Sequence, residues 1–129
     1  MAWDPVRQRV VLFGGSGQAG VLGDTWEWDG TTWTQRTPIT SPPARRAHAM
    51  AWDEGRQRVI IFGGYPNSLA DTWEWDGTTW LQRMPLNPPP PSAYLGLASD
   101  TVRRHVVLFG GQYSTGPTSF GTWVWDGTR

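Results

Sequence analysis

Apolar residues fall into short runs separated by Gly, Pro and Asp, and the same order of runs recurs along the chain. The clearest copy has small apolar residues at 47–52, a polar turn at 53–56, a β-branched run at 58–62 and an aromatic segment at 71–75. These lengths are typical of strands, and no stretch shows a 3.6-residue apolar period. We therefore predict strands at 47–52, 58–62, 71–75 and 78–82, and no helix.

The runs belong to an internal repeat. MAWDPVRQRVVLFGG at 1–15 and MAWDEGRQRVIIFGG at 50–64 are identical at eleven of fifteen positions, and LASDTVRRHVVLFGG at 97–111 is a looser copy. DTWEWDGTTW occurs at 24–33 and 71–80, and GTWVWDGTR closes the chain at 121–129. Four antiparallel strands in each period of 47 to 50 residues predict the blade of a β-propeller.

We divide the chain into three blades within one domain, 1–129: about 1–38, 44–85 and 92–129. The first and last are expected to be incomplete. Met1 aligns with Met50, inside the first strand of its blade, and the last blade stops before its fourth strand.

Glycine and tryptophan mark the repeat. Paired glycines end the second strand of each blade, where they allow positive φ and a close backbone approach; they are Gly14, Gly15, Gly63, Gly64, Gly110 and Gly111. Asp76-Gly77 predicts a tight type I′ hairpin. Tryptophans two residues apart share one strand face, which neighbouring blades could bury. The structural set is Trp26, Trp28, Trp33, Trp73, Trp75, Trp80, Trp123 and Trp125.

The Phe-Gly-Gly ends, the aromatic pair and the tryptophan of the fourth strand resemble the kelch family over essentially the whole chain. The Thr-Trp-Glu-Trp-Asp-Gly motif is similar to sequences of bacterial kelch-like proteins related to the central domain of galactose oxidase. The resemblance implies a partial kelch-type propeller. The copper site of galactose oxidase uses a Cys–Tyr cross-link, and this chain has no Cys.

The composition favours a binding scaffold over an enzyme. The formal charge is zero, which favours neither nucleic acid nor an anionic membrane as a partner. The two His are scattered, no paired carboxylates stand out, and we predict no metal, cofactor or catalytic residue. Gly15–Gly20 matches G-x-G-x-x-G, but the strand-like segment after it offers no helix N-terminus to a phosphate.

Glu27 and Glu74 lie on the strand face opposite the paired tryptophans. A buried carboxylate needs a partner, and Arg45 and His48 occur where kelch sequences often have Arg and His. We predict that Glu74 pairs with Arg45 or His48 in a structural role.

Candidate binding residues lie on the connections that vary between blades. The connections from second to third strand (B–C) are 16–23, 65–70 and 112–120, and those between blades (D–A) are rich in proline. In an up-and-down blade these connections emerge on one rim, and binding residues concentrate on variable loops. The candidates are Gln18, Tyr65, Asn67, Tyr113 and Phe120. We predict a protein or peptide partner, with a carbohydrate-binding or carbohydrate-active module as the alternative.

Three blades cannot close a ring that typically has four to eight. The chain could therefore be part of a longer propeller, form a homodimer with a six-bladed ring, or be an incomplete fragment without independent activity. The first residues lack the basic and apolar regions of a signal peptide, and no apolar run is long enough to span a bilayer. These features do not assign the chain to a cellular compartment.

Overall fold

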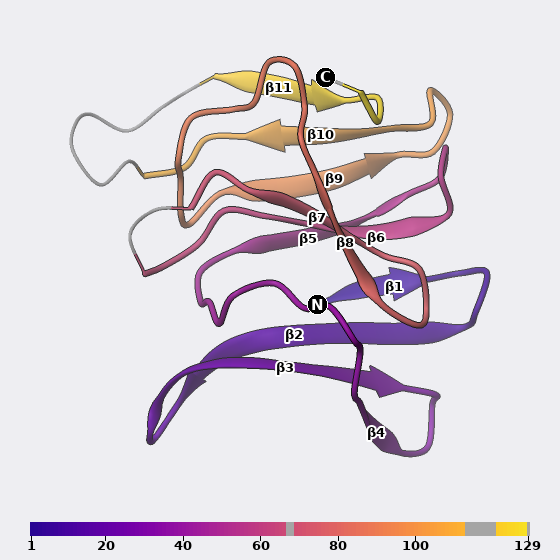
Figure 1. Cartoon of the computed structure of the whole chain (residues 1–129). Coiled ribbons are helices and arrows are strands. Elements are labelled where there is room, and N and C mark those ends of the chain that lie inside the picture. Colours follow the sequence, from indigo (N-terminus) through magenta and orange to yellow (C-terminus); the bar gives the residue numbers. More distant parts are fainter. Residues whose placement is uncertain (67–68, 113–120, 129) are drawn as a thin grey trace.

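The computed structural model describes residues 1–66, 69–112 and 121–128. These residues form eleven strands and no helix, which confirms the all-β prediction. The strands make three antiparallel sheets, and Figure 1 shows the sheets stacked in chain order, with the first at the bottom and the third at the top.

The first sheet has the strand order β1-β2-β3-β4. Its strands are β1 (Ala2–Asp4), β2 (Arg9–Gly17), β3 (Gly20–Trp28) and β4 (Trp33–Arg36). β1 has three residues, and the corresponding first strand of the second sheet has five.

The second sheet repeats this order with β5 (Ala49–Asp53), β6 (Arg58–Phe62), β7 (Thr72–Trp75) and β8 (Trp80–Arg83). The bounds of β6 are those predicted from the sequence, and the other three strands start one or two residues later than predicted. The third sheet has three strands, β9 (Gly96–Asp100), β10 (His105–Phe109) and β11 (Thr122–Trp125), with β10 in the middle.

The second sheet is the centre of the core because both of its faces are covered. All residues of β5 and β7, and all but the first of β6, are buried. One face packs its aromatic and aliphatic side chains on Val11 and Phe13 of the first sheet. The opposite face packs Ala51 and Ile60 against Val106 of the third sheet.

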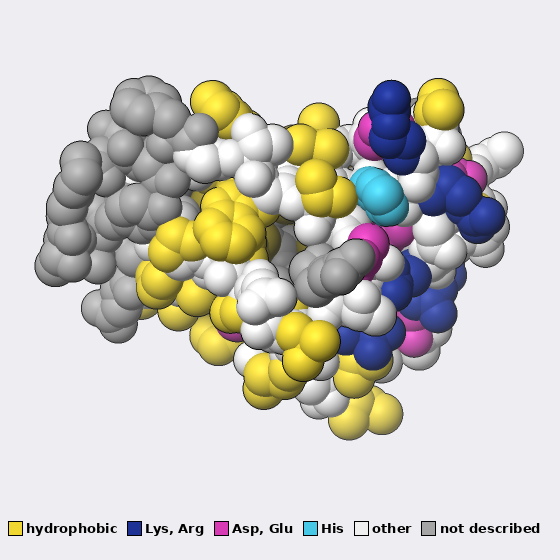
Figure 2. All heavy atoms as spheres, turned by 90° about the horizontal axis from the view of Figure 1, so that it is seen from above, with side chains coloured by type: hydrophobic (Ala, Val, Ile, Leu, Met, Phe, Trp, Pro, Cys, Tyr) yellow, Lys and Arg dark blue, Asp and Glu magenta, His cyan; other side chains and the backbone are white. Residues whose placement is uncertain are grey.

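The outward faces of the stack remain partly exposed. Trp3 and Trp33 of the first sheet are 51% and 43% exposed, and Phe109 of the third sheet is 55% exposed. Figure 2, seen from the side of the third sheet, shows apolar side chains gathered over much of the described surface and charged ones towards one end. Burial of the tryptophans between sheets is therefore complete only in the second sheet, where Trp52, Trp73, Trp75 and Trp80 are buried.

The paired glycines join consecutive sheets. Gly63 and Gly64 have φ of 70° and 107°, and Gly64 N–H donates to the Ser92 carbonyl at 2.8 Å. Gly15 N–H donates to the Arg45 carbonyl at the same distance, 2.8 Å. A Cβ at Gly63 would overlap the Ser92 carbonyl oxygen. Positive φ and close backbone approach, the two properties expected of this pair, are both present.

The hairpin between β7 and β8 differs from the prediction. Trp75 pairs with Trp80, so the loop covers 76–79, and only its glycine has positive φ, 95° at Gly77. The Asp76 carboxylate accepts hydrogen bonds from the Thr78 and Thr79 N–H groups at 2.7 and 2.8 Å. This side-chain cap favours the longer loop, and the type I′ prediction was wrong.

The segment 16–23 also differs from its predicted loop. β2 and β3 continue through it, with Ser16 paired to Val21 and Gly17 to Gly20, and only Gln18 and Ala19 form the tip. The register shifts between Phe13 and Gly15, where the glycines bend the strand. The G-x-G-x-x-G sequence thus lies in a β-hairpin.

Candidate functional site

The variable connections meet at one end of the stack. Because neighbouring strands are antiparallel, the tip of the β2–β3 hairpin, the segment after β6 and the segments before β5 and β9 lie at the same end, on the left in Figure 1. The short β1–β2, β5–β6 and β9–β10 turns lie at the other end. The strand order thus produces the arrangement of rims expected for up-and-down sheets.

Three residues from separate connections meet on this rim, and we call them the tyrosine rim site: Arg46, Tyr65 and Tyr94. The backbones of Arg46 and Tyr65 exchange two hydrogen bonds, of 3.0 and 2.8 Å. The rings of Tyr65 and Tyr94 meet edge to face, with centroids 5.7 Å apart. The site therefore joins the segments that precede β5, follow β6 and precede β9.

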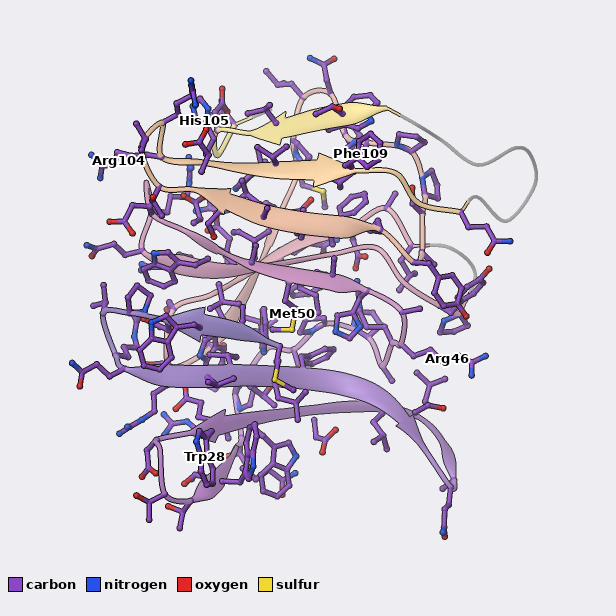
Figure 3. The ribbon with its side chains drawn as sticks, turned by 180° about the vertical axis from the view of Figure 1, so that it is seen from behind. Trp28, Arg46, Met50, Arg104, His105 and Phe109 are labelled. Atoms are coloured by element: carbon purple, nitrogen blue, oxygen red, sulfur yellow. The ribbon has the colours of Figure 1, made fainter. Side chains whose placement is uncertain are left out.

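Two of these side chains face solvent. Tyr94 is 65% exposed, and Figure 3 shows Arg46 extending outward at the end opposite Arg104 and His105. Tyr94 has φ of 55°, and its N–H donates to the Ala47 carbonyl at 2.9 Å. An exposed arginine on the segment that pairs with Tyr65, together with the two tyrosine rings, offers contact area, ring faces and hydrogen-bonding groups to a partner.

A buried ion pair supports the rim site from below. Arg45, which has no exposed surface, makes two hydrogen bonds of 2.7 Å to the two carboxylate oxygens of Asp71. It also donates to the Gly63 carbonyl at 3.1 Å, and Trp73 Nε1 donates to Asp71 at 2.6 Å. This network fixes the chain immediately before Arg46 to the residues around β6 and β7.

Asp71 and the nearby His48 both have lowered pKa values. Burial alone would raise the pKa of Asp71, but the hydrogen bonds from Arg45 and Trp73 and the charge of Arg45 hold that pKa below its ordinary value. Burial, together with the positive charges of the N-terminal amine and Arg45, lowers the pKa of His48 to about 4. Both groups therefore keep their pH 7 states well into the acid range, with a carboxylate at Asp71 and a neutral imidazole at His48.

The predicted partner of Glu74 was wrong. Arg45 binds Asp71 instead, and the Glu74 carboxylate lies 2.7 Å from Arg83 Nε and 3.5 Å from Arg56 Nε. The Arg56 contact is an ion pair without hydrogen-bond geometry, since the Glu74 Oε1 atom accepts no hydrogen bond among the described residues. His48 contacts the Phe13 ring at 6.0 Å between centroids. Arg83 was missed because it lies on the adjacent strand β8, two residues from the register partner of Glu74.

The predicted site residues are only partly brought together. Tyr65 belongs to the tyrosine rim site, whereas Gln18 stands at the exposed tip of the β2–β3 hairpin. Asn67, Tyr113 and Phe120 lie outside the described residues.

Arg46 and Tyr94 were missed, although the repeat carries a signal for both. Arg46 aligns with Ala93, and Tyr94 aligns with Ala47, so each is the larger residue where the copies differ. A comparison of the two segments that join consecutive sheets could have identified them.

The described part of the chain contains no group of three or more His, Cys, Asp or Glu side chains that could hold a metal ion, and none of its segments is a helix that could cross a membrane. A hollow lined mainly by residues of β1, β5 and β9 and by their turns lies away from the rim. The rim site is therefore the most specific grouping of polar and aromatic side chains at the variable end.

The comparisons with known proteins show similarity of fold. The structure titled "Structure of YjhT" matches 89% of this chain with a TM-score of 0.69 and 16% sequence identity. This chain spans 39% of the length of that structure. No protein-family model and no curated protein matches the chain.

Proposed function

We propose that this chain is a non-catalytic interaction module that binds a protein or peptide through the tyrosine rim site. The observation that carries the proposal is the meeting of Arg46, Tyr65 and Tyr94 from three connections on one rim, above the buried Arg45–Asp71 pair. Aromatic and arginine side chains held by a rigid base are typical of the residues that dominate binding energy.

We further propose that the three sheets are blades of a kelch-type propeller. The repeated Phe-Gly-Gly junctions, the tryptophan face of each repeat and the contacts of β5 with both β1 and β9 support this architecture. Further blades would come from a second copy of the chain or from a longer chain. The partly exposed outer faces of the first and third sheets, which carry Trp33 and Phe109, suit such packing.

The exposed tryptophans do not favour a carbohydrate platform on the rim. Trp3 and Trp33 are the most exposed of the described tryptophans, and they lie in β1 and at the start of β4. Trp33 follows the short turn between β3 and β4, at the end opposite the tyrosine rim site.

The test is selection of a peptide ligand from a displayed random library, followed by affinity measurement with variants. We expect the double variant Tyr65→Ala, Tyr94→Ala to bind the selected peptide at least about tenfold more weakly, because each tyrosine ring would be buried against the peptide. Val102→Ala, at an 88% exposed position between β9 and β10, is the matched control and should leave affinity unchanged. Equal affinity of the double variant, or binding of glycans and no peptide in a parallel screen, would contradict the proposal.

A further inference from the structure

The connection between β8 and β9 contains four consecutive prolines, at 88–91. The connection spans residues 84–95 and belongs to no strand, and in Figure 1 it rises from β8 to the level of β11 before it descends to β9. Each proline ring fixes φ at about −65° and favours an extended conformation of the residue before it. Four prolines in a row therefore favour a polyproline II helix, which has about three residues per turn.

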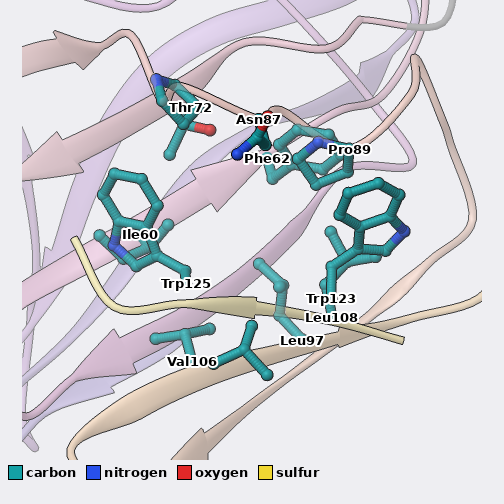
Figure 4. Close-up of a pocket in the computed structure, with 12 residues that line it drawn as sticks. Ile60, Phe62, Thr72, Asn87, Pro89, Leu97, Val106, Leu108, Trp123 and Trp125 are labelled. Atoms are coloured by element: carbon teal, nitrogen blue, oxygen red, sulfur yellow. The ribbon is translucent and has the colours of Figure 1, made fainter. Parts of the chain in front are cut away.

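The four prolines have two different environments. Pro88 and Pro91 are exposed, whereas Pro89 and Pro90 are half-buried. Pro89 lines a cavity between the second and third sheets (Figure 4), and the Pro90 carbonyl accepts a hydrogen bond of 2.7 Å from the Ser92 hydroxyl. The middle pair thus holds the segment on the protein. The outer pair is three residues apart and shares one side of a polyproline II helix, which faces solvent.

The first connection between sheets provides an internal control. Its residues Ser41 and Ala44 align with Pro88 and Pro91, and both are exposed. This connection leads into the four-stranded second sheet, so exposure at these two positions is a property of the repeat. The middle two prolines occur in both connections, and in the first one Pro42 is buried. Packing between sheets therefore accounts for the middle pair but not for the two exposed prolines.

The exposed side of this segment also offers apolar area and hydrogen-bond acceptors. Leu86 is 82% exposed, and the aligned Ile39 of the first connection is 100% exposed. Among the described residues, no group donates a hydrogen bond to the carbonyl of Pro88 or Pro91. Domains that bind polyproline II helices do so in grooves lined by aromatic rings, and they gain from a helix that is already formed before binding.

We propose that the segment 86–91 is a ligand for a partner domain whose aromatic-lined groove binds polyproline II helices. Pro88 and Pro91 pack between the aromatic rings of that groove, Leu86 extends the apolar contact, and the free carbonyls accept hydrogen bonds from the partner. In this interaction the chain supplies the peptide and the partner supplies the groove. The tyrosine rim site has the opposite role, and neither proposal rests on the other.

The experiment titrates the full chain into isotope-labelled SH3, WW and EVH1 domains, one at a time, and follows the amide and indole signals of each domain by NMR. We expect saturable shifts, concentrated in the aromatic groove, in at least one domain. Pro88→Ser with Pro91→Ala introduces the residues of the first connection and should weaken binding at least about tenfold, because both groove contacts are lost. Val102→Ala, between β9 and β10, is the control and should bind as the wild type does. Absence of binding to every domain of the panel would overturn the proposal.

A reciprocal variant separates binding from any change in stability. Ser41→Pro with Ala44→Pro places four prolines in the first connection as well, and neither N–H that it removes donates a hydrogen bond among the described residues. Calorimetric titration with the domain that binds should then give two sites per chain instead of one. A single site in this folded variant would contradict the assignment. Lower thermal stability of Pro88→Ser, Pro91→Ala with unchanged affinity would also contradict it, because the exposed prolines would then only stiffen the connection.

Discussion

The two interfaces between sheets are built from the same repeat but differ in how completely they are filled. In the first interface Trp75 and Trp80 are buried, their rings 5.4 Å apart, and their indoles donate to Glu27 and Thr25 at 3.0 Å. In the second interface Trp125 donates to Asp53 at 3.1 Å instead of to Glu74, and an apolar cavity of about 240 Å³, lined in part by Ile60, Phe62 and Thr72, lies between the sheets.

The difference shows which part of the repeat joins the sheets and which part fills the space between them. The glycine junction has the same hydrogen bond in both interfaces, 2.8 Å from Gly15 to Arg45 and from Gly64 to Ser92. Among the described residues, the first interface holds the buried Trp80, whereas the second contains a cavity. Sheet stacking therefore depends on the junction, whereas close packing depends on the tryptophan.

The largest effect is expected from Trp80→Ala. The variant would leave a cavity in the first interface, as the second already has one, and it should lower the free energy of unfolding by about 3 to 5 kcal/mol. Trp33→Ala, at the aligned but 43% exposed position, should cost about 1 kcal/mol or less. Urea denaturation measures both. Similar losses for the two variants would show that Trp80 does not fill a seat between sheets.

Arg45→Met should cost about 3 kcal/mol, because it leaves the Asp71 carboxylate without its charged partner. Arg46→Met, at the exposed neighbouring position, should change stability by about 0.5 kcal/mol or less. The third repeat has Ser92 and Gly121 at the aligned positions, so this ion pair distinguishes the second sheet from the third.

The same pair predicts a pH dependence. Because the pKa of Asp71 is lowered in the folded chain, its stabilisation is present above the ordinary value of 3.8 and is lost as the pH falls through the lowered pKa. In urea titrations repeated from pH 5 downward, the free energy of unfolding of Arg45→Met should fall less than that of the wild type. An unchanged acid loss in the variant would contradict the role of Arg45.

Gly14→Ala and Gly63→Ala should each cost about 2 kcal/mol, since both glycines have positive φ and an added Cβ meets a carbonyl oxygen of the next segment. Gly30 also has a positive φ, 100°, but no atom lies within 4 Å of an added Cβ. Gly30→Ala should therefore lower the free energy of unfolding by only about 1 kcal/mol. Thermal unfolding compares the three variants. A large cost at only one of the two junctions would refute their equivalence.

The smallest effect is expected from His48→Leu, which introduces the residue found at the aligned position 95. Since the pKa of His48 falls from 6.5 to about 4 on folding, the unfolded chain binds more protons in this window. Wild-type stability should therefore decrease as the pH falls from 6.5 to 4, and the variant should show a flatter profile. Equal slopes would show that His48 does not carry this dependence.

The sequence predicted features that depend on neighbouring residues in the chain. The β-branched run 58–62 became β6 with the predicted bounds, and the paired glycines adopt the required positive φ, because period and backbone geometry are local properties. The β2–β3 extension was missed because its residues 16–23 are rich in glycine, and their pairing depends on the hairpin register.

Features that depend on distant residues could not be derived in this way. Arg45 and Asp71 are 26 positions apart, and both Asp71 and Glu74 lie within reach of an arginine from another segment. Composition cannot choose between such partners. The tyrosine rim site was half predicted, through Tyr65, because the variable connections could be identified but the contacts between them could not.

Amide hydrogen exchange followed by mass spectrometry tests most directly whether the second sheet is sandwiched between a filled and an unfilled interface. Segments 58–62 and 72–75 should exchange slowest in the chain, whereas 105–109 and 122–125, with the same sequence pattern, should exchange distinctly faster. Equal protection of these two pairs of segments, or rapid exchange at 58–62, would contradict the account.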